Sequence, residues 1–311
     1  MAEEGKDVLF RVLLDFGILV VMALPSFILE VIGVPFHRGF FCDDESISLP
    51  VKPDTVPIWA VALVGIGLNF IVIIVVELVI YLKLKRGVTL KDPKFQKRYQ
   101  LCSKAVHPYL IAVYKSLGYF LLGCALSQGS TDISKYNIGR LRPFFLDACQ
   151  PDYSKFNCTD SRGFMQYITA DVCTGDEHLI KEARLSHPSG HSSFSVFSMI
   201  YLSLYLQSKL TWTGSKLYKY FLEAAALYLA LYVCLSRISD NRHHWSDVLG
   251  GGVLGALVAL IVGVLISDLY TKPSMKEISA KLQELRQVSL KKDDGYGAVN
   301  NPNNVALVHR D

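Results

Sequence analysis

The sequence predicts an all-α polytopic membrane protein, a bundle of six transmembrane helices. Three runs, 57–76, 188–208 and 248–267, contain no Asp, Glu, Lys or Arg, and about 20 such residues are enough for a helix to cross the bilayer core. Charged residues make up 19% of the 311-residue chain, against about 25% in ordinary soluble proteins. These features exclude a soluble globular protein, and the runs are too long for the short alternating strands of an outer-membrane barrel.

The hydropathy pattern places the six spans at 10–33, 57–82, 106–128, 191–209, 217–237 and 246–270. The first apolar stretch is too long for a signal peptide and has no small-residue cleavage site, so we expect it to remain as the first span. An even number of spans puts both termini on one side of the membrane. We therefore expect one six-span domain, 1–270, followed by a largely disordered tail, 271–311.

The basic residues decide which side faces the cytosol. The loop 83–105 is rich in Lys and Arg and has Asp92 as its single acidic residue, whereas 34–56 carries more acidic than basic residues. The positive-inside rule puts 83–105, both termini and the tail in the cytosol. Three segments then lie outside: 34–56, 129–190 and 238–245. The net charge of +4 is small and dispersed, so we expect no nucleic-acid partner.

The long outer loop, 129–190, carries chemistry typical of an oxidising compartment. It contains a glycosylation sequon, Asn157-Cys158-Thr159, so we expect a glycan on Asn157. Four of the seven cysteines lie in outer segments and could pair, in an order that the sequence leaves open: Cys42, Cys149, Cys158 and Cys173. We expect the other three, which lie in or near spans, to be packing residues: Cys102, Cys124 and Cys234.

Polar residues of chemical interest gather in three short segments, 135–143, 188–191 and 236–247. Taken singly, each has a structural explanation. Lys or Arg beside a span usually extends to the lipid headgroups, and a Ser-Gly pair before a helix is commonly an N-cap. A lone His at a membrane boundary is more often interfacial than catalytic. The functional interpretation gains weight because the topology puts all three segments on the outer face.

Together these segments carry the groups that bind a phosphate ester. One guanidinium group can donate two parallel hydrogen bonds to phosphate oxygens, and a Lys ammonium group adds a point charge. Ser189 and Gly190 would begin a helix, whose N-terminal N–H groups form an anion site, and Gly190 would let the backbone approach closely. We expect five residues to bind the substrate phosphate: Lys135, Arg142, Ser189, Gly190 and Arg237.

Two histidines and one carboxylate complete the candidate site. His243 and Asp247 are spaced i, i+4, so on a helix they share a face and the carboxylate can accept from one ring N–H. The other ring nitrogen of His243 is then free to act as a nucleophile. His244, at i, i+3 from Asp247, is the alternative nucleophile. His191 would be the general acid for the departing alkoxide.

A metal site is the main chemical alternative. His187 and His191 are also spaced i, i+4, and with His243 and Asp247 they could form a zinc shell. Pro188 interrupts any helix between the two histidines, however, and three nearby cations would repel a metal ion. We therefore expect neither a metal nor a cofactor.

The three segments match known motifs. They read K-x6-R-P from Lys135, P-S-G-H from Pro188 and S-R-x5-H-x3-D from Ser236, and in this order they resemble the signature of the type 2 phosphatidic acid phosphatase (PAP2) superfamily. The runs 38–42, 138–143 and 243–247 are similar to the animal lipid phosphate phosphatase branch. The resemblance covers roughly residues 8 to 270.

The resemblance implies a PAP2-type helical bundle with an outward-facing, metal-independent phosphatase site. Substrates of the branch are phosphatidate, lysophosphatidate, sphingosine 1-phosphate and ceramide 1-phosphate. The resemblance also implies a role for three residues: His243 is the nucleophile that forms a phosphohistidine, His191 is the acid and Asp247 is the orienting carboxylate. Arg140 and His187 are not motif positions and receive no role.

Two other functions remain open. The first is a non-catalytic membrane protein that binds lipid phosphates or mediates adhesion, and the intact His191, His243 and Asp247 argue against it. The second is a transporter, which should have a set of polar residues near the midplane; Glu30, Asn69 and Glu77 form no such set. We expect a homo-oligomer among membrane lipids, in the plasma membrane first and otherwise in the endoplasmic reticulum or Golgi.

Overall fold

The computed structural model describes residues 5–85, 100–101, 104–210 and 216–270. The long helices in this part are α1 (Gly5–Ile32), α2 (Ile58–Lys85), α4 (Pro108–Ile138), α7 (Gly190–Lys209), α8 (Lys216–Ser239) and α9 (Trp245–Leu260), and α9 continues as a π-helical segment, η2 (Ile261–Ile266). The short elements are η1 (Glu45–Ile47), α5 (Phe145–Cys149), α6 (Glu177–Ala183) and the antiparallel pair β1 (Gln100–Leu101) and β2 (Lys104–Ala105). The mostly helical fold confirms the predicted class. The tail, 271–311, lies outside the described residues.

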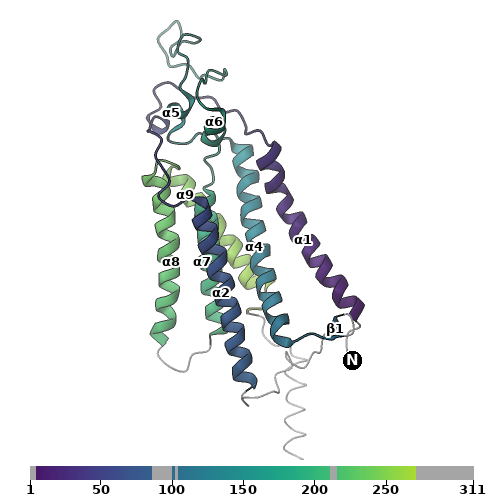
Figure 1. Cartoon of the computed structure of the whole chain (residues 1–311). Helices are drawn as coiled ribbons and strands as arrows, with labels where there is room; N and C mark the ends of the chain where they lie inside the picture. The colour runs from purple at the N-terminus through teal and green to yellow at the C-terminus, as the bar shows by residue number, and fades with distance from the viewer. Residues whose placement is uncertain (1–4, 86–99, 102–103, 211–215, 271–311) are drawn as a thin grey trace, which may run out of the picture. The chain divides into compact units, whose positions relative to one another are not determined.

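Five of these helices are long and apolar enough to cross a membrane: α1, α2, α4, α8 and α9. The predicted fourth span, 191–209, forms α7 but does not meet that criterion within the described part of the chain. The reason is its place in the bundle, since α7 packs against α2, α4, α8 and α9 (Figure 1). A helix surrounded by protein can carry serines where a lipid-facing helix needs apolar side chains. The fourth span, and with it the count of six spans, stays a prediction.

Helices α7 and α9 approach each other closely at their N-terminal ends. A Cβ added at Gly251 would overlap the carbonyl oxygen of Ser189, and one at Gly255 would overlap that of Ser193. Only glycine leaves room for this backbone-to-backbone contact. The contact brings the segment 243–247, which leads into α9, against the start of α7.

The predicted third span ends too early. Helix α4 continues to Ile138 instead of ending near residue 128, so the first part of the expected outer loop, 129–138, is helical. Gly139 ends the helix with a left-handed backbone (φ 55°) and donates to the carbonyl of Lys135. Lys135 therefore stands on the last turn of a rigid helix and not on a loop.

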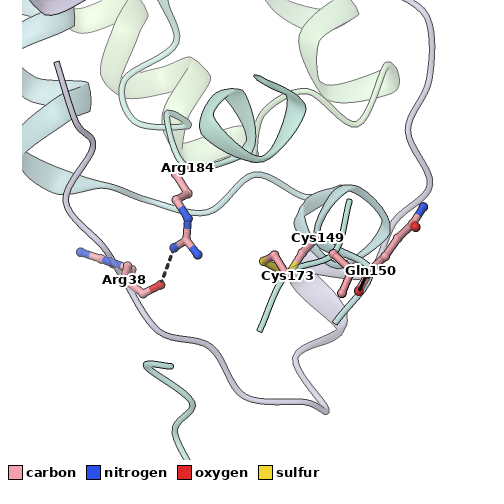
Figure 2. The surroundings of a disulfide bond; sticks show 6 residues. Arg38, Cys149, Gln150, Cys173 and Arg184 are labelled. Carbon is pink, nitrogen blue, oxygen red and sulfur yellow. Dashed lines mark hydrogen bonds between the residues drawn. A yellow bond between two sulfur atoms is a disulfide. The ribbon is translucent and has the colours of Figure 1, made fainter. Parts of the chain in front are cut away.

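The segments 33–57 and 139–189 form a cap at one end of the bundle, where α5 and α6 lie (Figure 1). Two disulfides, Cys42–Cys158 and Cys149–Cys173, close it. All four expected cysteines therefore pair, and Cys124 and Cys234 are free within helices. Arg184 donates to the carbonyl of Arg38 at 3.0 Å beside the second disulfide (Figure 2). Cys102 lies outside the described residues.

We expect Gly255→Ala to lower the free energy of unfolding by about 1–3 kcal/mol, the usual cost of overpacking a core. Gly252→Ala is the matched control, because a Cβ there meets only Val196 Cγ2 at 3.8 Å. Both variants gain the same helix propensity, so their thermal unfolding midpoints in detergent isolate the packing effect. Equal midpoints would contradict the close approach of α7 and α9.

Candidate active site

The three sequence segments meet at the capped end of the bundle. The Nζ of Lys135 lies 3.1 Å from the point where a Cβ on Gly190 would stand. The amide of Ser189 donates to the carbonyl of Asp247 at 3.0 Å, and Nη1 of Arg237 lies 3.5 Å from Nε2 of His191. The fold thus brings the expected cations and histidines from α4, α7, α8 and the start of α9 into one cluster.

The start of α7 has the geometry of an anion site. Ser189 is the N-cap, and its Oγ accepts from the amide of Ser192 at 3.4 Å and from the hydroxyl of Ser192 at 3.0 Å. The structural explanation for Ser189 is therefore correct, and its hydroxyl oxygen is already engaged as an acceptor. Gly190 has a different use, because a Cβ at this position would crowd Lys135 Nζ at 3.1 Å, and its absence lets the ammonium group lie against the helix N-terminus without a shift.

The carboxylate of Asp247 is fully buried and lies at the centre of a polar network. It accepts from Nη1 of Arg140 (2.6 Å), Oγ of Ser186 (2.6 Å), Nδ1 of His187 (3.1 Å), and Nδ1 and the amide of His244 (both 3.0 Å). The predicted bond to His243 is absent among these contacts. That expectation was wrong because α9 begins only at Trp245, so His243 precedes the helix and the i, i+4 relation does not apply.

His243 is buried, and its Nδ1 has no hydrogen-bond partner among the described residues. Burial, followed by the positive charges of Arg142 and Lys135, lowers the pKa of His243 well below its ordinary value. The imidazole is therefore neutral at pH 7. A neutral ring in front of a cluster of cations is the protonation state that nucleophilic attack requires.

His244, the alternative nucleophile, is held at both ends of its ring. Its Nδ1 bonds Asp247 and its Nε2 lies 3.1 Å from the carbonyl oxygen of Ser46. Both ring nitrogens thus face oxygen atoms of the protein, so neither is open to an incoming phosphorus atom. The geometry therefore favours His243 over His244.

Arg237 is almost fully buried, with 1% of its side chain exposed. Its guanidinium donates to Asp54 at 2.8 Å and to Asp240 at 2.9 Å. Asp54 belongs to the segment that enters α2, so a residue of the first outer segment reaches into the site. Asp240 lies one helical turn from Arg237 and holds the other edge of the guanidinium.

Arg242, like Arg140, is a cation of the site that the motifs do not mark. It forms ion pairs with Asp54 (3.1 Å) and Glu182 (3.5 Å), and Glu182 also accepts from Arg142 at 2.8 Å. Both arginines lie over the ring of Phe144, at 5.7 Å for Arg142 and 5.3 Å for Arg242. Nε of Arg142 is buried without a hydrogen-bond partner in the described part of the molecule. An unsatisfied buried guanidinium N–H is unusual, and it is a donor that an anion at this site would engage.

The sequence analysis gave no part in this network to six of its residues: Asp54, Arg140, Glu182, Ser186, His187 and Arg242. Most of these residues enter the site through tertiary contacts, which a sequence pattern does not reveal. The amide of Arg142 donates to the carbonyl of Ala183 (2.7 Å), and the amide of Ser186 donates to the carbonyl of Arg140 (3.0 Å). These bonds align two segments more than 40 positions apart along the chain. Arg140 and Arg242 had sequence cues, since Arg140 lies inside the first motif and Arg242 directly precedes His243.

The described residues hold no set of three or more His, Cys, Asp or Glu side chains arranged to bind a metal ion. His187, half of the possible zinc pair, instead bonds Asp247. Asn157 is exposed on the cap, as an acceptor of a glycan must be.

Comparisons with known proteins show the family of this chain. Residues 116–270 match the PAP2 superfamily. Phospholipid phosphatase 1 of Rattus norvegicus is 42% identical over 267 residues, which cover 86% of this chain and 88% of that protein. Phospholipid phosphatase 2 of the same species is 38% identical over 279 residues, which cover 90% and 94%.

Phospholipid phosphatase 2 of Mus musculus is 39% identical over 259 residues, which cover 83% of this chain and 87% of that protein. No solved structure matches the chain. The similarity extends over nearly the whole described region and includes all three motif segments. The chain therefore belongs to the PAP2 superfamily, in its lipid phosphate phosphatase branch.

Proposed function

We propose that this protein is an integral-membrane enzyme that removes the phosphate from lipid phosphate monoesters, without a metal, through a phosphohistidine. The observation that carries the proposal is the cluster of Lys135, Arg142 and Arg237 around a neutral, buried His243 at one end of an apolar bundle. The similarity to proteins named phospholipid phosphatase supports a lipid substrate. The proposed substrates are phosphatidate, lysophosphatidate, sphingosine 1-phosphate and ceramide 1-phosphate.

The phosphate would bind where the cations converge. Lys135, the amide of Gly190 and the hydroxyl hydrogen of Ser189 would hold one side of the phosphate, and Arg142 and Arg237 the other, because the amide of Ser189 already donates to Asp247. Arginine can hold phosphate oxygens in a bidentate manner and so fix the phosphorus for in-line attack. These groups stabilise the charge on the equatorial oxygens as the transition state forms.

His243 then attacks phosphorus, and the bond to the lipid oxygen breaks. His191 donates a proton to the departing alkoxide, since a phosphate dianion beside the ring favours its protonated form. Water, deprotonated by His191, hydrolyses the phosphohistidine and restores neutral His243. Asp247 acts as a positioning residue, because its carboxylate holds His244, the neighbour of His243, together with Arg140 and His187.

The proposed site faces the extracellular or luminal side, and the domain extends over 1–270. Both disulfides and the sequon lie in the segments that the charge distribution puts outside, and disulfides form in oxidising compartments. The plasma membrane is the first proposed location. A homo-oligomer remains a prediction.

A non-catalytic lipid-binding protein would need the cations but neither an acid nor a nucleophile. His191 beside Arg237, and His243 neutral and unpaired, are costly features for simple binding, since buried unsatisfied polar groups destabilise a fold. The arrangement therefore favours turnover.

The intermediate can be trapped. Quenching a reaction with a phosphate-labelled lipid should give an acid-labile, base-stable label on the protein, and His243→Ala should abolish both label and turnover. His191→Ala should slow turnover by about 10²–10⁴-fold, as is typical of a general acid–base residue. His244→Ala is the matched control and should still be labelled. A label that maps to His244 would overturn the assignment of the nucleophile.

Activity should survive excess EDTA. The three cations supply the positive charge that a two-metal phosphatase takes from its ions. The measurement is phosphate release from phosphatidate in detergent micelles, with and without chelator. Loss of activity that added zinc or magnesium restores would reject the metal-independent mechanism.

Asn157→Gln should remove a glycosidase-sensitive mobility shift when the protein is made in animal cells. The sequon is exposed on the cap, and glycans are added only on the luminal side. An unglycosylated wild-type chain would remove this support for the proposed orientation.

A further inference from the structure

An apolar groove lies between α2, α7 and α8, with a cavity volume of about 110 Å³. Its walls include Ala60 and Val64 of α2, Met199 of α7, and Leu229 and Tyr232 of α8. Three wall residues are exposed to the surroundings of the bundle: Val64 by 41%, Leu229 by 37% and Tyr232 by 57%. The groove therefore opens sideways, toward the bilayer.

The groove begins one helical turn below the catalytic cluster. Val233, in its wall, precedes Arg237 by four residues on α8, and Ser195 follows His191 by four residues on α7. Four residues of helix correspond to about 6 Å. At its upper end, Val56 lies two residues from Asp54, the partner of Arg237. A molecule whose phosphate sits among the arginines would extend directly into this groove.

One polar atom in the wall has no partner. Ser195 is 4% exposed, and its Oγ forms no hydrogen bond within the described part of the chain. Neighbouring serines of α7 are satisfied: Ser193 bonds Ser127 at 2.8 Å and Ser198 bonds the carbonyl of Ser195 at 3.1 Å. A buried hydroxyl without a partner costs free energy, so an acceptor from a ligand would stabilise it.

We propose that the groove binds the chain of the lipid substrate nearest its headgroup, and that Ser195 Oγ donates to the ester carbonyl that joins this chain to the glycerol. The proposal rests on the proposed function and adds the binding site for the lipid's linkage and first methylenes. Three observations indicate a lipid chain as the occupant: the groove continues from the phosphate site, it opens toward the bilayer, and Ser195 Oγ in its wall has no partner among the described residues. A lipid chain that moves from the bilayer into the groove passes from one apolar environment to another, so its transfer gains little hydrophobic free energy. The shape of the groove and the hydrogen bond to Ser195 therefore decide which lipids bind.

The hydrogen bond can be tested with two substrates that differ in one group. Ser195→Ala should lower kcat/KM for 1-oleoyl lysophosphatidate by about 3–10-fold, the value of a typical hydrogen bond. The same variant should leave kcat/KM for the 1-O-alkyl ether analogue within about twofold, because the ether lacks the carbonyl. Ser203→Ala is the matched control, since Ser203 bonds only the carbonyl of Met199 on the same helix, and it should affect neither lipid. Equal losses for both lipids, or none, would overturn the role of Ser195.

The groove itself can be tested by filling it. Ala60→Trp should lower kcat/KM for 1-oleoyl lysophosphatidate about 10-fold or more and leave that for p-nitrophenyl phosphate, which has no chain, unchanged. Leu63→Trp is the control, because Leu63 is 66% exposed and is not part of the groove wall. Unchanged lipid turnover in a folded Ala60→Trp protein, or equal losses for both substrates, would refute the groove.

A second measurement does not depend on the Trp variant folding. A lysophosphatidate with a diazirine near its ester should cross-link the inactive His243→Ala protein at 56–65, 195–199 or 229–233, and cross-links confined to residues outside these ranges would refute the groove. A wild-type protein that releases phosphate from no lipid would instead reject the proposed function.

Discussion

The buried carboxylate of Asp247 is the interaction on which the rest of the site depends. It has no solvent exposure, so its charge must be balanced by protein groups, and Arg140, Ser186, His187 and His244 supply them. A buried charge that loses its partners costs several kcal/mol. The carboxylate therefore ties the 140–143 segment and the approach to α7 to the first turn of α9. Two of the three motif segments meet at this one group.

The need to balance buried charge also explains why carboxylates surround the arginines. Arg142, Arg237 and Arg242 are largely withdrawn from water, and Asp54 and Glu182 each bridge two of them. These acids occupy positions that a phosphate dianion would compete for. Substrate binding is then an exchange of one anion for another and not the filling of an empty cationic pocket. Such an exchange limits the free-energy cost of keeping several cations together in the absence of substrate.

Much of this arrangement follows from local patterns in the sequence. Apolar runs predict the helices, and three motifs predict that Lys135, His191 and Arg237 converge. The sequence patterns fail where tertiary contacts determine the composition of a helix or the partner of a side chain. Helix α7 is too serine-rich for a lipid-facing span because other helices surround it, and His243 lies outside α9, so its predicted bond to Asp247 does not form. The disulfide partners and the ligands of Asp247 come from distant segments, whose alignment no spacing rule predicts.

The central claim is that His243 attacks a phosphate held by the arginine cluster. Vanadate adopts the five-coordinate geometry of that transition state, so a structure of the vanadate complex tests the claim most directly. We predict vanadium bonded to a ring nitrogen of His243, with its equatorial oxygens on Lys135, Arg142 and Arg237 and with Asp54 displaced from Arg237. Vanadate bonded to His244, or bound through a metal ion with His243 uninvolved, would contradict the account.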